Sequence, residues 1–240
     1  NHAPPLLLSR ATKKRFLELL GVEVLVCVPF TVELAQLSPV DFAREVLHGE
    51  LAVREVIVGY NFTFGHRGAG KAEDLRRYGA RYGFNVHIIP PVEIDGQVVS
   101  STLIRQLLGA GDVEGARRYL GYAPFVEGKV VVGDQRGFPT ANVAVPENLL
   151  LPANGVYAVR VRIGDDVFWG VANVGTRPTF YSNQHRPGVE VHVLDFCRDL
   201  YGRDIKVIFV QRLRAERKFH DPAELINQIR QDIGCVRAIG

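Results

Sequence analysis

The sequence has no methionine among its 240 residues and only three cysteines. Cys27, Cys197 and Cys235 are widely spaced and form no C-x-x-C pair, which argues against a disulfide framework and against a zinc site. Such unpaired cysteines are typical of a reducing compartment, so we expect a cytoplasmic protein without a signal peptide. Chains of this size normally contain several methionines, so we also expect that residues of the natural protein are missing from this sequence.

Long apolar runs and strong charge are lacking as well. The longest apolar run, residues 22–30, is interrupted by Glu23 and Pro29 and is far shorter than the roughly 20 residues that span a bilayer. A formal net charge of +3 gives no concentrated basic stripe of the kind that nucleic-acid-binding proteins carry. We therefore expect no membrane and no nucleic-acid partner, whereas nucleotide-sized anions are allowed. The sequence does not indicate an oligomeric state.

The first half of the chain alternates strand-sized and helix-sized segments. β-Branched strands are predicted at residues 22–30, 54–62 and 84–92. Helices are predicted at residues 10–20, 39–48, 73–82, from 100 onward and at 112–120. This alternation is typical of a parallel sheet covered by helices, so it predicts an α/β domain.

After Gly121 the pattern changes to short, valine-rich, alternating segments separated by Gly, Pro and Asn. Strands are predicted at residues 125–133, 155–164, 167–175, 189–196 and 205–213. Several short strands without helices between them predict a small antiparallel β-barrel. A capping box at Asp221–Glu224 predicts one C-terminal helix. We place the domain boundary between residues 1–121 and 122–240.

The pentapeptide at residues 138–142, FPTAN, contains two oxygen-bearing side chains. The hydroxyl of Thr140 and the amide of Asn142 suit Mg²⁺ and phosphate. Just before them lie Gly133, Arg136 and Gly137, two flexible residues and a cation of the kind that cradle phosphate. From these residues alone, an ordinary turn is the commoner explanation.

A second candidate is Glu190, in the predicted strand at residues 189–196. The alternation of a strand places Glu190 and His192 on one face and the valines on the other. A carboxylate close to a substrate hydroxyl can accept its proton as a general base. A solvent-facing side chain is the alternative for Glu190, and more strongly so for His192.

Further blocks follow the pentapeptide in order: GVYAV at 155–159, GVANVGTRPTF at 170–180, then residues 190–196, 199–202 and 214–219. Together they closely resemble the riboflavin kinase domain over residues 122–240. The resemblance implies transfer of phosphate from ATP to riboflavin, giving FMN.

Specific roles come with that resemblance. It implies that Thr140 ligates Mg²⁺ with the ATP phosphates, that Asn142 supports this metal site, and that Glu190 activates the ribityl 5′-hydroxyl. The loop with Gly133, Arg136 and Gly137 would cover the phosphates, although it is shorter here than in the family. No role follows for His192.

Two segments of the first domain also suggest nucleotide binding. Residues 59–65, GYNFTFG, follow a predicted strand, and residues 100–105, SSTLIR, open a predicted helix. Hydroxyls and a cation at a helix N-terminus suit phosphate, although a plain N-cap also explains them. With Leu120-Gly121, these segments resemble the FMN adenylyltransferase domain of the bacterial bifunctional riboflavin kinase/FAD synthetase.

That resemblance implies a Rossmann-like nucleotidyltransferase domain that makes FAD from FMN and ATP. Its nucleotide-binding residues would be Asn61, Ser101, Thr102 and Arg105. In the family this domain begins with a strand and a segment GxFDGxHxGH, which residues 1–30 do not match. We therefore expect an N-terminally incomplete α/β domain, from which a segment is omitted.

The leading hypothesis is an enzyme of FAD biosynthesis with ATP, Mg²⁺ and the flavins riboflavin, FMN and FAD as ligands. Two alternatives stay open at this point. One is a riboflavin kinase whose α/β domain is not catalytic, and the other is a non-catalytic flavin- or nucleotide-binding protein. A nucleic-acid-binding barrel has little support from the weak net charge.

Overall fold

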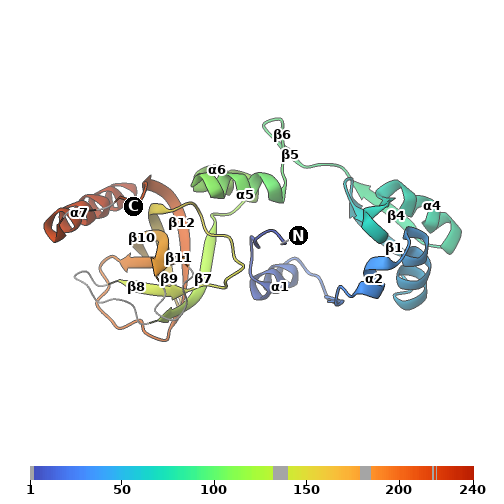
Figure 1. Ribbon diagram of the computed structural model, residues 1–240, viewed down its shortest axis with the longest axis horizontal. Helices are drawn as coiled ribbons and strands as arrows, with labels where there is room; N and C mark the ends of the chain where they lie inside the picture. Colours follow the sequence, from blue (N-terminus) through green and yellow to red (C-terminus); the bar gives the residue numbers. More distant parts are fainter. Residues whose placement is uncertain (1–2, 132–139, 179–184, 218, 220) are drawn as a thin grey trace. The chain divides into compact units, whose positions relative to one another are not determined.

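The computed structural model describes residues 3–131, 140–178, 185–217, 219 and 221–240 (Figure 1). Contacts divide the chain into two compact units. The larger comprises Asn1–Leu20 with Val99–Gly240, and the smaller comprises Gly21–Val98. These units are structural, so the functional division between residues 121 and 122 stays a prediction.

The smaller unit is an α/β fold built on two parallel strands. β1 (Glu55–Gly59) pairs with β4 (Asn85–Ile89), and α4 (Ala72–Tyr82) packs against β4. Leu75 of α4 is fully buried, and Gly83 ends the helix in the left-handed conformation. The remaining helices of this unit are α2 (Val32–Gln36), α3 (Pro39–Asp41), the π-helix η1 (Phe42–Glu50) and the 3₁₀ turn η2 (His66–Gly68). Two short antiparallel strand pairs complete it: β2 (Thr63–Phe64) pairs with β3 (Gly70–Lys71), and β5 (Glu93–Ile94) pairs with β6 (Gln97–Val98).

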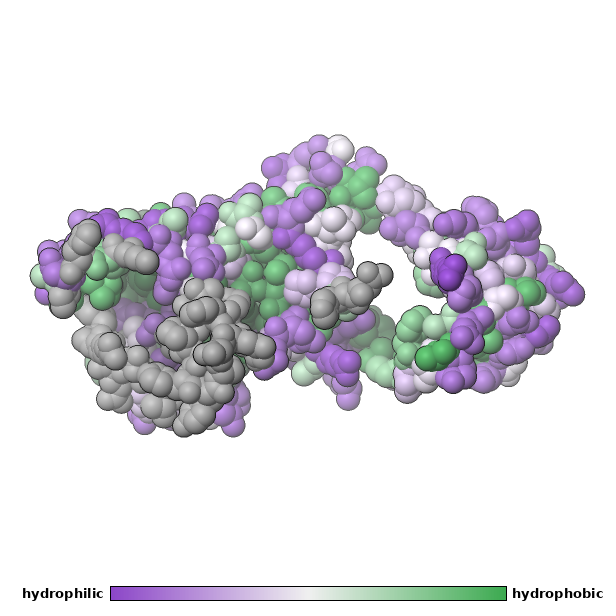
Figure 2. All heavy atoms as spheres, viewed as in Figure 1, coloured by the Kyte–Doolittle hydropathy of each residue, from purple (hydrophilic) through white to green (hydrophobic). Residues whose placement is uncertain are grey.

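Most of the α/β prediction is confirmed, but the strand predicted at residues 22–30 is wrong. This segment forms no strand, and Val24 and Phe30 are 75% and 84% exposed. Apolar side chains reach the surface in this way in both units (Figure 2). A strand needs a partner for its backbone N–H and C=O groups, and within the described residues none pairs with this segment. High β-propensity alone does not make a strand.

The larger unit contains the predicted antiparallel barrel, closed by six strands in the order β10-β11-β8-β7-β12-β9 (Figure 1). The strands are β7 (Phe125–Val131), β8 (Ala141–Ala144), β9 (Gly155–Ile163), β10 (Asp166–Pro178), β11 (His185–Val193) and β12 (Asp204–Arg214). Alternate valines fill the interior, where Tyr157 and Phe209 meet edge to face with ring centroids 5.4 Å apart.

The predicted C-terminal helix, α7 (Pro222–Ile239), covers part of the outside of this barrel. Asp221 caps it by accepting a hydrogen bond from the Glu224 N–H at 2.8 Å. Val236 of the helix packs on Val156, Ala158 and Val171 of the neighbouring strands β9 and β10. The helix therefore borders whatever site lies on the outer face of those strands.

Three other helices belong to the larger unit: α1 (Arg10–Leu19), α5 (Ser101–Ala110) and α6 (Val113–Leu120). Thr12 of α1 donates to Glu127 of β7 at 2.8 Å, which attaches this helix to the barrel. Ile104 and Ala116, from α5 and α6, enter the barrel core cluster.

Candidate functional site

Three polar side chains stand side by side on neighbouring strands of the barrel. The register pairs Glu190 of β11 with Asn142 of β8 on one side and with Asn173 of β10 on the other. Their neighbours along the strands belong to the barrel core: Ala141, Val143, Ala172, Val174, Val189 and Val191. Because side chains alternate along a strand, the three polar side chains point outward. We call Asn142, Glu190 and Asn173 the polar row.

Thr140, directly before β8, joins this row. Its hydroxyl donates a hydrogen bond to Oε1 of Glu190, and both side chains are partly buried. The structure thus brings together the kinase residues that the sequence predicts, Thr140, Asn142 and Glu190. A hydroxyl that donates to a carboxylate still has lone pairs for another ligand.

Asn142 is the buried end of the row, with 5% of its surface exposed. Its Oδ1 atom has no hydrogen-bond partner among the described residues. Leaving such an amide oxygen unpaired costs about 1–3 kcal/mol, so a ligand is expected there. Amide and hydroxyl oxygens suit Mg²⁺, which also keeps positions for phosphate oxygens. Asn142 and Thr140 therefore fit the metal that the resemblance implies.

On the other side of the row, a second carboxylate lies next to Asn173. A Cβ atom added at Gly175 would lie 2.2 Å from Oε1 of Glu216 and 3.3 Å from Nδ2 of Asn173. The carboxylate of Glu216 therefore rests against bare backbone, in a place that only glycine leaves open. The amide of Asn154 donates to its other oxygen at 3.4 Å.

The segment that carries Glu216 is clamped to α7. Arg214 makes a forked contact with Asp232, with N–O distances of 2.9–3.2 Å. Gln228 donates to the same carboxylate at 3.1 Å, and Asp232 is only 4% exposed. Arg217 adds an ion pair with Glu224. These contacts fix the backbone on both sides of Glu216.

Asn173 and Glu216 are not among the residues predicted from the sequence, although both lie in the blocks that resemble riboflavin kinases. Asn173 could have been found from the alternation of side chains along its predicted strand, which places Val171, Asn173 and Gly175 on the same face. No local pattern relates Glu216 to Gly175, because only the fold brings them together. His192 lies on the same face of β11 as Glu190, opposite Val171, and its role stays open.

Three predicted residues of the kinase site, Gly133, Arg136 and Gly137, lie outside the described residues. Their part in phosphate binding stays a prediction.

The predicted nucleotide-binding residues of the first domain belong to different compact units. Asn61 is exposed in the turn after β1, in the smaller unit. Ser101 and Thr102 are exposed in the first turn of α5, in the larger unit, where Ser100 caps the helix by accepting from the Leu103 N–H at 3.2 Å. Arg105 donates to the carbonyl of Pro5 at 3.0 Å. Their joint role stays a prediction.

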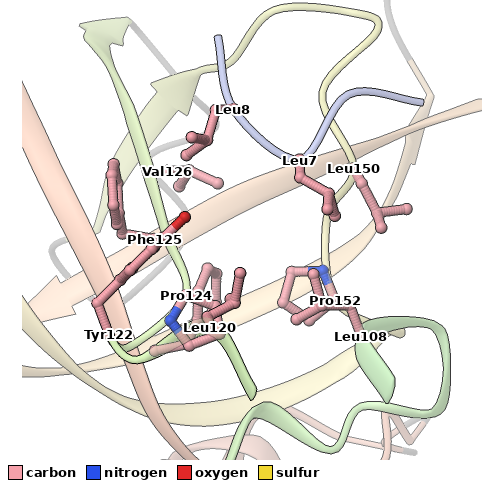
Figure 3. Close-up of a pocket in the computed structure, with 11 residues that line it drawn as sticks. Leu7, Leu8, Leu108, Leu120, Tyr122, Pro124, Phe125, Val126, Leu150 and Pro152 are labelled. Carbon is pink, nitrogen blue, oxygen red and sulfur yellow. The ribbon is translucent and has the colours of Figure 1, made fainter. Parts of the chain in front are cut away.

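A hollow elsewhere in the larger unit is not a second site of this kind (Figure 3). Its volume is about 20 Å³, and apolar side chains such as Leu7, Leu108 and Val126 line it. That space is enough for about one water molecule and far too small for a nucleotide or a flavin. It shares no residue with the polar row.

Two family models match the chain. Residues 120–239 match "Riboflavin kinase", and residues 1–103 match "FAD synthetase". Across the described residues, no helix combines the length and the apolar character needed to cross a membrane.

Relatives match over most of the chain. A bifunctional riboflavin kinase/FMN adenylyltransferase of Listeria monocytogenes is 37% identical over 91% of this chain and 70% of its own length. The protein of that name from Escherichia coli K12 is also 37% identical, over 96% of this chain and 74% of its own. A crystal structure described as a macrolide-efflux protein from Streptococcus pneumoniae is 33% identical, with a TM-score of 0.85 over 96% of this chain and 75% of that one.

Proposed function

The chain belongs to the family of bifunctional riboflavin kinase/FMN adenylyltransferases, and we propose that Thr140, Asn142 and Glu190 form its kinase site. Membership places the chain in FAD biosynthesis by way of FMN, with ATP as the second substrate of both steps. The barrel makes FMN from riboflavin, and the FAD synthetase part converts FMN to FAD.

Glu190 has the position of a general base in the kinase reaction. It accepts the proton of the ribityl 5′-hydroxyl as that oxygen bonds to the γ-phosphorus of ATP, and the bond from the γ-phosphorus to the bridging oxygen breaks to release ADP. Thr140 holds the carboxylate through its hydrogen bond. Mg²⁺, when bound, neutralises charge on the phosphates, and Asn142 and Thr140 are the residues that would hold it.

A single observation supports this assignment most directly. The buried Oδ1 of Asn142, which has no partner in the part of the chain that the structure describes, lies beside the hydrogen-bonded pair Thr140 and Glu190. An ordinary surface turn has no reason to bury an unpaired amide oxygen. An oxygen ligand site next to a carboxylate has the two groups that phosphoryl transfer to a hydroxyl requires.

Replacing Glu190 tests the kinase site. We expect Glu190→Gln to lower the rate of FMN formation from riboflavin and ATP by about 100-fold or more, the usual contribution of a general base. Asp165→Asn, in the exposed turn between β9 and β10, is the matched control and should leave the rate unchanged. Unchanged FMN formation in Glu190→Gln would show that another group is the base. A parent protein that binds riboflavin and forms no FMN would favour the non-catalytic alternative.

For the adenylyltransferase step we propose Asn61, Ser101, Thr102 and Arg105 as nucleotide-binding residues. We expect Arg105→Met to lower FAD formation from FMN and ATP about tenfold, as the loss of one charge-assisted contact would. Arg105→Lys keeps the charge and should be affected less. FMN that accumulates without FAD in the full-length protein would instead favour a kinase with a non-catalytic α/β domain.

We also propose a cytoplasmic location. Its support is that Cys27, Cys197 and Cys235 are all free thiols on the surface, as in proteins of reducing compartments. Cell fractionation with an antibody against the protein tests this, and recovery from an oxidising compartment would contradict it.

A further inference from the structure

We infer that Asn173 and Glu216 form a polyol subsite, which binds the secondary hydroxyls of the ribityl chain beside the hydroxyl that reacts at Glu190. This inference rests on the proposed kinase site and adds the residues that recognise the substrate's chain.

The positions follow from the sheet. Asn173 lies directly opposite Glu190, one inter-strand step of about 4.8 Å away. Burial decreases along the same direction: Asn142 is buried, Glu190 and Asn173 are partly buried, and Glu216 is exposed. A substrate whose terminal hydroxyl meets Glu190 and whose bulk faces solvent therefore extends past Asn173 and Glu216.

The two side chains converge on one point. The position of a Cβ atom above Gly175 is 3.3 Å from the amide nitrogen of Asn173 and 2.2 Å from a carboxylate oxygen of Glu216. A donor and an acceptor thus lie close together over backbone that carries no side chain. Gly175 leaves room there for the carboxylate itself.

This combination of groups matches a polyol. Each hydroxyl both donates and accepts, so a pair of neighbouring hydroxyls can accept from the amide of Asn173 and donate to the carboxylate of Glu216. An alkyl chain makes no such hydrogen bonds. It would displace the water bound to both polar groups and leave their hydrogen bonds unmade.

Glu216 is held in place from the protein side. The forked contact of Arg214 with Asp232 and the ion pair of Arg217 with Glu224 fix the residues before and after it. Asn154 contacts its Oε2 atom at 3.4 Å, and Oε1 is the oxygen that faces Gly175 and Asn173. The fixed backbone keeps the exposed Glu216 side chain within reach of Gly175 and Asn173, where its Oε1 atom can accept a hydroxyl.

The experiment compares two substrates in the same enzyme. One is riboflavin, and the other is a flavin with a 5-hydroxypentyl chain, which has the reacting hydroxyl and lacks the secondary ones. We expect Asn173→Ala and Glu216→Ala each to lower kcat/KM for riboflavin about tenfold, the effect of one lost hydrogen bond to substrate. Neither should change kcat/KM for the hydroxypentyl flavin. Asp165→Asn should change neither value.

Equal losses with the two substrates, or no loss with riboflavin, would overturn the polyol subsite. Asn173→Ser and Gly175→Ala repeat the test in case Asn173→Ala does not fold; the added methyl group of Gly175→Ala displaces Glu216 without removing it. Glu190→Gln separates the two proposals. If it is inactive while the Asn173 and Glu216 variants resemble the parent, only the polyol subsite is wrong, and if it is active the kinase site itself is wrong.

Discussion

The hydroxyl of Thr140 donates a hydrogen bond to the carboxylate of Glu190, although 50 residues separate them in the chain. The contact exists because β8 and β11 are neighbours in the closed barrel, with Asn142 directly opposite Glu190. A carboxylate that accepts a proton from one defined hydroxyl reacts faster when its orientation is fixed in this way.

Removing only this hydroxyl tests its importance. We expect Thr140→Val, which keeps the shape of the side chain, to lower FMN formation about 10- to 100-fold, as groups that orient a metal ligand or catalytic residue commonly do. Thr140→Ser keeps the hydroxyl and should retain most of the activity. Steady-state kinetics with riboflavin and ATP measure both variants. Equal activity of the valine and serine variants would show that the hydroxyl has no part in the reaction.

The ion pair between Arg214 and Asp232 should be important for stability. We expect Asp232→Ala to lower the free energy of unfolding by about 3–5 kcal/mol, because it leaves the guanidinium of Arg214 partly buried without its partner. Urea denaturation measures this. Glu73→Ala, which removes an exposed pair with Arg76, is the control and should change stability by less than about 1 kcal/mol. A loss of less than about 1 kcal/mol in Asp232→Ala as well would contradict a stabilising role for the contact between Arg214 and Asp232.

The barrel could be predicted from the sequence because its signal is local. Alternating valines and turn residues define each strand without reference to its partner, and β9, β10 and β12 lie where the alternation places them. The capping residues of the C-terminal helix are equally local, since Asp221 bonds three residues ahead.

The arrangement of the site could not be predicted in the same way. From the sequence alone Glu190 could be a solvent-facing residue, because its neighbours lie elsewhere in the chain: Thr140 directly before β8, and Asn173 in β10. The resemblance to riboflavin kinases assigned Glu190 a role but gave none to Glu216, whose place beside Gly175 depends on the packing of α7. Strand pairing also explains why the strand predicted at residues 22–30 does not form. This segment is rich in β-branched residues, but it has no partner strand among the described residues.

The exposed segment at residues 22–30 should promote self-association. Val26 and Val28 are 59% and 60% exposed in a run of high β-propensity, which is the kind of sequence that pairs between molecules. We expect Val26→Lys to raise the concentration at which light scattering detects aggregates. Val167→Lys, at an exposed position of the closed barrel, is the control and should have no such effect. Aggregation reduced equally by both variants would indicate an effect of net charge alone.

Stability above neutral pH should depend on Tyr157. Its ring is fully buried in the barrel, and its hydroxyl donates to the carbonyl of Ala153. Burial raises the pKa of Tyr157 above its ordinary value of 10.0, and the charge of Arg212 opposes this only in part. A raised pKa means that the folded state keeps the proton when the unfolded chain has begun to lose it. The stabilisation by Tyr157 is therefore complete below pH 10 and is lost as the pH rises from there toward the folded-state pKa.

Tyr157→Phe removes this titration and the hydrogen bond together. We expect the variant to be less stable than the parent by about 1 kcal/mol at neutral pH, the usual value of one hydrogen bond. Above pH 10 the difference should shrink, by at most about 1.4 kcal/mol for each pH unit, because only the parent loses stability through this group. Urea denaturation from pH 8 to pH 11 measures both proteins, with Tyr60→Phe at an exposed position as the control. Other titrating groups are common to the parent and the variant, so their effects cancel in the difference. A constant difference up to pH 11 would mean that Tyr157 has the same pKa in the folded and unfolded states, and burial of its hydroxyl would then have no consequence for the pH dependence of folding.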